Sequence, residues 1–138
     1  MAISEVISPF FGRCAIVFFY GIAATNIVEN WSPTVQVMTS KGVPVAPLVL
    51  LVVYFLILVS CISLFIGFHA RHGAVTLFAV SLISTVTMHD FWHLNIGPQR
   101  AAELALFTRD IAICGGLLLL VGMGPGPFAF DNYRNREG

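Results

Sequence analysis

Four long runs without Asp, Glu, Lys or Arg dominate the pattern of apolar and polar positions along this chain. The hydrocarbon core of a bilayer is about 30 Å thick and takes about 20 mostly apolar residues of helix to cross. Helices are the spanning structure for such segments, because backbone N–H and C=O groups must find partners inside lipid. The pattern therefore predicts four transmembrane helices, at about residues 9–27, 45–67, 73–91 and 101–122.

Proline and glycine mark the ends of these helices. Pro9 suits a first helical turn, where its missing N–H has no intrahelical partner. The pair Ser32-Pro33 lies beyond the predicted end of the first helix, so we expect residues 26–44 to form the longest loop. The Gly/Pro run at 122–127 cannot continue the last helix.

Composition agrees with this interpretation. The chain is 57% hydrophobic and 10% charged, whereas soluble domains have about 25% charged residues. We predict one integral membrane domain over residues 1–138, an all-α bundle of four transmembrane helices with the lipid bilayer as its surroundings. The formal net charge is zero, which gives no electrostatic case for nucleic acid as a partner.

Basic residues in the short loops predict the orientation, since they are enriched on the cytoplasmic side. One side of the predicted bundle has Lys41 and Arg100, and the other has Arg13, Arg71, Arg134 and Arg136. This imbalance favours a cytoplasmic location for both termini.

Ionisable residues gather in the second half of the chain. Ionisable groups inside membrane helices are costly and often mark function. Ser81, Thr85, His89 and His93 are each four residues apart, so we expect them to form one stripe along the third helix. Glu103 and Asp110 lie seven residues apart and share a face of the fourth helix. The candidate site comprises His89, Asp90, His93, Glu103, Arg109 and Asp110.

Three interpretations of this cluster remain open. We favour a buried ion-pair network that joins the third and fourth helices, with Arg109 facing Asp90, Glu103 or both. A polar pocket that touches a quinone is the second. A metal ion held by His89 and His93 is the third and least favoured. We assign no residue as catalytic or as a metal ligand.

Several short motifs carry a family resemblance. They are Arg13, the prolines of 42–47, Gly67 with Arg71, His89-Asp90-Phe91-Trp92, Cys114-Gly115-Gly116, and the Gly-Pro-Gly ending that runs to Asp131. In this order the chain resembles the DoxX-like family of small four-helix bacterial membrane proteins. The resemblance implies a multi-pass protein of the bacterial inner (cytoplasmic) membrane with an association with redox chemistry and quinones.

Departures from that family pattern shape the predicted function. Many relatives carry a lysine late in the first helix and a glutamate in the second, whereas residues 21–26 and 54–63 have no charge here. We therefore expect an accessory subunit of a larger, redox-related membrane complex, respiratory or photosynthetic. It would contact other membrane subunits, bind no cofactor directly and have no catalytic activity of its own.

Two other functions remain open. One is a quinone-linked oxidoreductase subunit with its polar site near His89, Asp90 and Arg109. The other is a small-solute transporter, although no inverted repeat is detectable in the sequence.

Overall fold

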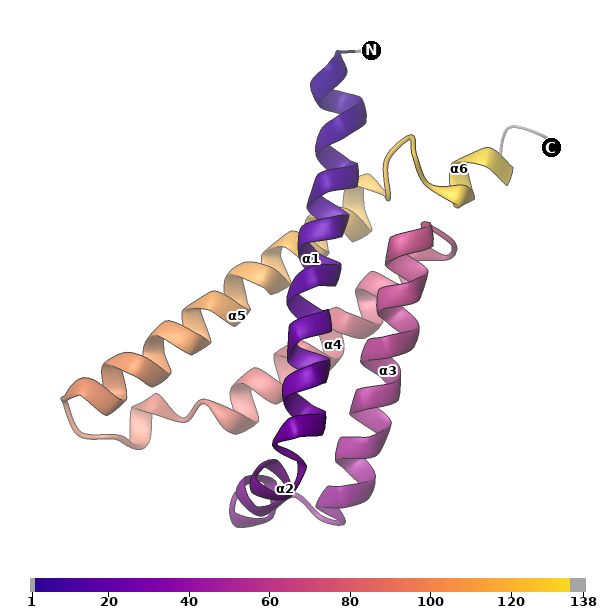
Figure 1. Ribbon diagram of the computed structural model, residues 1–138. Coiled ribbons are helices and arrows are strands. Elements are labelled where there is room, and N and C mark those ends of the chain that lie inside the picture. Colours follow the sequence, from indigo (N-terminus) through magenta and orange to yellow (C-terminus); the bar gives the residue numbers. More distant parts are fainter. Residues whose placement is uncertain (1, 135–138) are drawn as a thin grey trace.

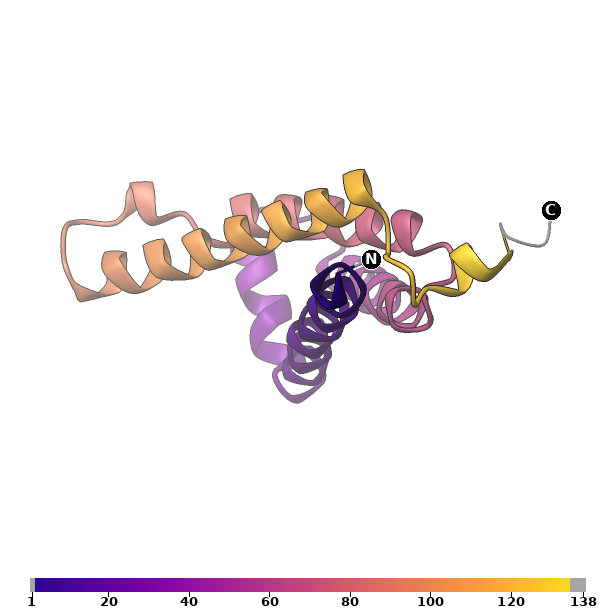
Figure 2. The same cartoon turned by 90° about the horizontal axis from the view of Figure 1, so that it is seen from above.

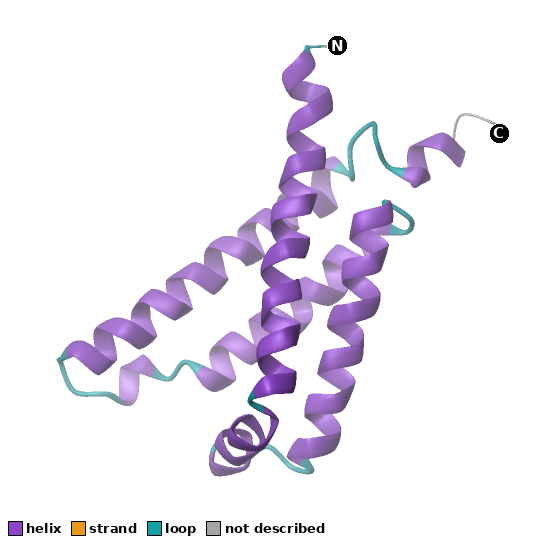
Figure 3. Ribbon diagram, viewed as in Figure 1, coloured by secondary structure: helices purple, strands orange, loops and turns teal. Residues whose placement is uncertain are grey.

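The computed structural model describes residues 2–134, and within that range every regular element is helical. The elements are α1 (Ile3–Glu29), α2 (Trp31–Ser40), α3 (Ala46–Ile66), α4 (Ala70–Met88), the 3₁₀ turn η1 (Phe91–His93), α5 (Pro98–Met123) and α6 (Phe130–Arg134). Short loops join them (Figure 3). Four helical segments are long and apolar enough to cross a membrane, which confirms the prediction of an all-α protein with four candidate spans.

The four long helices form two crossing pairs (Figures 1 and 2). α1 packs along α3, and α4 packs along both α3 and α5. The α4–α5 hairpin extends past the α1–α3 pair at one end (Figure 1). The two described ends of the chain lie toward the same end of the molecule (Figure 1).

The core lies where these pairs meet. Leu64, Leu77 and Leu117, one each from α3, α4 and α5, are completely buried. Gly73 of α4 lets the α3 backbone approach, because a Cβ at that position would lie 3.0 Å from the Ser63 hydroxyl. Small residues commonly permit such close helix packing in membranes. There the hydrophobic effect does not drive helices together, so close van der Waals contact matters more.

Helix α1 begins at Ile3, so the prediction of a start at Pro9 was wrong. The Ala2 carbonyl accepts from the Glu5 N–H at 3.0 Å and closes a first turn before the proline. Pro9 lies inside the helix, and its missing N–H removes one bond of the helical ladder, which the chain tolerates.

The predicted long loop at 26–44 is also wrong, because it contains α2. Pro33 lies in the first turn of α2, where a missing N–H costs no hydrogen bond. Met38 is buried against Ala46 and Leu50 at the start of α3. This contact gives α2 a packed face that its weak hydropathy did not predict.

Helix α4 differs from the predicted range 73–91 at both ends. It begins at Ala70, where the Asp131 carboxylate accepts hydrogen bonds from the backbone N–H groups of His69 (2.9 Å) and Ala70 (3.0 Å). It ends at Met88, and the chain continues in the separate turn η1. Residues 89–93 therefore do not continue the helical stripe expected from the sequence.

Candidate functional site

A cavity of about 330 Å³ lies between the two helix pairs. Its walls are mostly apolar and come from α1, α2, α3, α4 and α5. Apolar residues that line it include Phe19, Ala23, Ile27, Met38, Leu50, Val53, Ile57, Val80, Met88 and Ile113. Ligand cavities in proteins typically combine such walls with a few placed polar groups.

The polar groups of this cavity come chiefly from α4 and α5. Arg109 and Asp110 line it from the middle of α5. Thr85 of α4 is buried, and its hydroxyl donates to Asp110 Oδ2 at 3.2 Å. The hydroxyls of Tyr20 and Ser81, which also line the cavity, hydrogen-bond each other across α1 and α4.

His89 connects Asp110 to Glu103. Its Nδ1 lies 2.8 Å from Glu103 Oε2, and its Nε2 lies 3.4 Å from Asp110 Oδ2. Glu103 and Asp110 reach the same imidazole because they lie about two turns apart on one face of α5. The ring donates to both carboxylates only when both nitrogens carry hydrogen.

Arg109 does not face Asp90 or Glu103, contrary to our expectation from the sequence. Its Nε donates to Asp110 Oδ1 at 2.9 Å, and its carbon Cζ lies 5.2 Å from the centre of the Phe19 ring. Neighbouring helical side chains diverge by about 100°, but the long arginine side chain folds back to its neighbour. The Arg109 side chain is 50% exposed, compared with 16% for Asp110.

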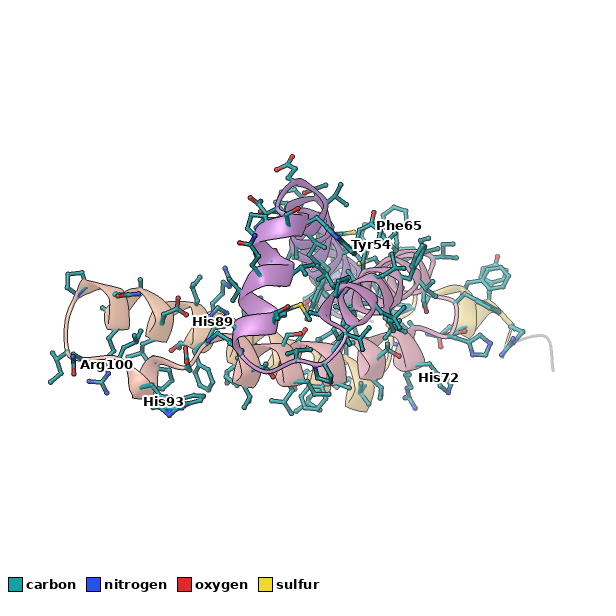
Figure 4. All side chains as sticks on the ribbon, turned by 90° about the horizontal axis from the view of Figure 1, so that it is seen from below. Tyr54, Phe65, His72, His89, His93 and Arg100 are labelled. Carbon is teal, nitrogen blue, oxygen red and sulfur yellow. The ribbon has the colours of Figure 1, made fainter. Side chains whose placement is uncertain are left out.

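Asp90 and His93 lie outside this group. The Asp90 carboxylate accepts from Lys41 Nζ at 2.8 Å, so it joins the end of α2 to the segment after α4. His93 belongs to η1, and Figure 4 shows it farther along the α4–α5 hairpin than His89. The two histidines therefore do not share a helix face. Residues 2–134 contain no group of three His, Cys, Asp or Glu side chains placed to hold a metal ion.

The structure thus brings together His89, Glu103, Arg109 and Asp110 and separates Asp90 and His93 from them. Sequence reasoning missed Lys41 and Phe19 as partners. Lys41 is the one lysine in the chain, and this could have marked it as a candidate partner for a carboxylate. Phe19 had no signal that separated it from the other aromatic residues of its helix.

Fold and site together define a multi-pass helical membrane protein with a mostly apolar cavity between its helices, into which a few polar groups of α4 and α5 face. The chain belongs to the SURF4 family, whose family model matches residues 37–136. This range includes the whole of α3, α4 and α5 and the polar group described above.

Three curated proteins illustrate the similarity. Surfeit locus protein 4 homolog of Schizosaccharomyces pombe is 32% identical over 82 residues, which cover 59% of this chain and 27% of that protein. An uncharacterized protein of Caenorhabditis elegans is 30% identical over 79 residues, covering 54% and 27% respectively. The chain therefore spans about a quarter of the length of these two relatives. Inner membrane protein YqjF of Escherichia coli is 23% identical over 135 residues and 96% of each chain. No solved structure matches.

The predicted resemblance to the DoxX-like family was wrong, because the matching family model is that of SURF4. The motifs that suggested DoxX, such as Pro44, Gly67 and the Gly-Pro-Gly ending, lie largely at helix boundaries. Glycine and proline at these positions follow from the conformation of a helix end, so they do not by themselves distinguish one family of helical membrane proteins from another.

Proposed function

We propose that this protein binds a small, uncharged amphiphile in the cavity between its helix pairs. The observation that carries the proposal is an apolar cavity of about 330 Å³ with Arg109 and Asp110 in its wall at mid-helix. Charged groups at that depth are costly in a bilayer and usually serve function.

Charge in the cavity wall favours a neutral ligand. Arg109 and Asp110 lie in the wall and pair with each other, and His89 joins Asp110 to Glu103 outside the lining. Even with His89 protonated, the group has no surplus positive charge to attract an anion. Arg109 keeps N–H donors beyond those used on Asp110, and these suit carbonyl oxygens.

A quinone meets both requirements, because its ring is apolar and its two carbonyl oxygens accept hydrogen bonds. Its tail would extend from the cavity toward the lipid. This proposal rests on the cavity alone, since the earlier link to redox proteins depended on the DoxX resemblance.

Binding of a short-chain ubiquinone to the purified chain in nanodiscs tests the proposal by calorimetry. Ala23 lines the cavity, so Ala23→Leu should fill it and weaken binding by about tenfold or more. Ala15→Leu is the matched control, because Ala15 is exposed on the same helix and does not line the cavity. Equal affinities for the two variants would overturn the proposal.

An accessory role in a larger membrane complex is the second candidate function. One observation favours it: α1 packs along α3 and touches little of α5, so much of its surface is open. Phe18 of α1 is 70% exposed and Phe55 of α3 is 56% exposed. Such faces suit another helical subunit as well as lipid. Mild-detergent purification that yields this chain in a fixed ratio to a second protein would support the role.

We also propose the inner membrane of a bacterium as its location. The name of the Escherichia coli relative, an inner membrane protein that matches over nearly its whole length, supports this proposal. Arg71, Arg134 and Arg136 outnumber Lys41 and Arg100 on the opposite side, which supports a cytoplasmic location for both termini.

A further inference from the structure

We propose that a second site, at the other end of the α4–α5 hairpin, binds a phosphate group. A cleft of about 700 Å³ lies there between the start of α4 and the segment after α5. We call it the basic cleft; its lining includes His69, Arg71, His72 and Arg134, with Met123–Pro127, Asp131 and Asn132. It shares no lining residue with the cavity between the helix pairs.

Hydrogen bonds fix the floor of the basic cleft. The Asn132 side-chain amide donates to the Gly126 carbonyl at 2.7 Å, and the Asp131 N–H donates to the Gly67 carbonyl at 3.0 Å. Gly126 has φ +84°, and a Cβ there would lie 2.5 Å from Pro9 Cβ. The segment 124–132 is therefore held against α1 and α3, so the cleft is formed before any ligand arrives.

The charged side chains of the basic cleft that can still accept a ligand are its two arginines, Arg71 and Arg134. Asp131 is its one described carboxylate, and both of its oxygens already accept backbone hydrogen bonds. The Arg71 guanidinium lies close to Gly124: a Cβ built on Gly124 would lie 3.3 Å from a terminal nitrogen of Arg71. Arg134 lies over the Phe68 ring, 5.8 Å from its centre. Within residues 2–134 neither arginine makes a salt bridge.

A phosphate group fits these features best. The planar guanidinium matches phosphate oxygens with paired N–H donors. The cleft lies where two candidate spans end, which is the level of lipid headgroups in a bilayer. Figure 4 shows His72 at this end, far from His89 and Arg100. An anionic lipid headgroup and a soluble phosphate share this chemistry.

Two measurements on the full chain test the site and separate its sources. Native mass spectrometry measures phosphatidylglycerol retained by the protein, and phosphorus NMR titration measures inorganic phosphate bound in detergent without that lipid. We expect Arg71→Gln to weaken whichever ligand binds by about fivefold. Arg71→Lys should lose less, because it keeps the charge.

Arg100→Gln is the matched control, since Arg100 lies in the first turn of α5 at the opposite end. Retention of the lipid identifies a headgroup site, and binding of phosphate alone identifies a soluble ligand; either result, with the Arg71 dependence, supports the proposal. Equal effects of Arg71→Gln and Arg100→Gln, with both proteins folded, would overturn it, as would the absence of binding in both measurements.

Discussion

Some single residues of this chain stabilise the fold through contacts that a hydropathy pattern does not reveal. Arg13 is the clearest example: it lies within the first candidate span and is only 2% exposed. Its guanidinium donates to the carbonyls of Leu64 (3.5 Å) and Phe128 (3.1 Å). These carbonyls belong to the end of α3 and to the segment after α5, so one side chain joins three parts of the chain.

Gly67 shows how little space this arrangement leaves. It has φ +77°, and a Cβ there would lie 2.5 Å from the Arg13 guanidinium and 2.7 Å from the Ala129 backbone. Gly67→Ala should therefore lower the free energy of unfolding by about 2–4 kcal/mol through backbone strain and overpacking. Thermal unfolding in detergent measures the loss.

Gly12→Ala is the control for this substitution. Gly12 lies in the helical α1, and nothing is within 4 Å of a Cβ built there. Helix propensity predicts a gain of up to about 1 kcal/mol. A loss at Gly12 as large as that at Gly67 would contradict the explanation.

The interaction of His89 with Glu103 gives a second prediction at this scale. His89→Leu leaves Glu103 and Asp110 without their shared partner, so the single variant should lose about 1–3 kcal/mol. His89→Leu combined with Glu103→Leu should lose less than the two single losses added together. Strict additivity in this double-mutant cycle would show that the pair contributes nothing.

At the scale of elements, the sequence predicted the four spanning helices because charge is absent over lengths set by the bilayer. It did not predict α2, whose stability depends on Met38 packing against Leu50, a contact across the connecting turn. It also extended α4 too far, since apolar Phe91 and Trp92 continue the hydropathy signal beyond the true end at Met88. The end of α4 involves the Lys41–Asp90 ion pair, which joins residues distant in sequence.

In the site too, contacts that follow from helical spacing were predictable, and a contact made by a long flexible side chain was not. His89, Glu103 and Asp110 meet as helical spacing allows. The partner of Arg109, its neighbour Asp110, was not predictable, because a flexible arginine side chain can reach several acceptors and helix geometry alone does not decide among them.

Met38 provides the prediction for α2. Met38→Ala should loosen α2 and increase its backbone hydrogen exchange, because the buried side chain supplies much of its contact with α3. Exchange in α4 should change little. Val37→Ala is the control: Val37 is 41% exposed, so its truncation should leave exchange in α2 close to that of the parent protein.

At the scale of the whole molecule, both described ends lie toward the same end (Figure 1), as expected if all four candidate spans cross the bilayer. The fold alone does not say which side. The arginine count predicts the cytoplasmic side for the termini and for the basic cleft, where anionic lipid headgroups are most abundant.

Cysteine labelling tests this orientation. A membrane-impermeant maleimide applied to intact cells should modify Ser40→Cys, at the end of α2, and leave Tyr133→Cys unmodified. Both positions are exposed. The unaltered protein is the control for its own cysteines, of which Cys61 and Cys114 are buried. The reverse labelling pattern would show that the predicted orientation is wrong.

The two hydrogen bonds between the Asp131 carboxylate and the start of α4 have a consequence for the order in which the chain is synthesised and folds. The carboxylate that completes this helix is synthesised about 60 residues after the helix begins, which is roughly 3–12 s of translation. During that interval the His69 and Ala70 N–H groups lack the partner that they have in the folded chain. A nascent chain stopped just after α5 would contain all four candidate spans described here and still lack the residue that caps the third of them.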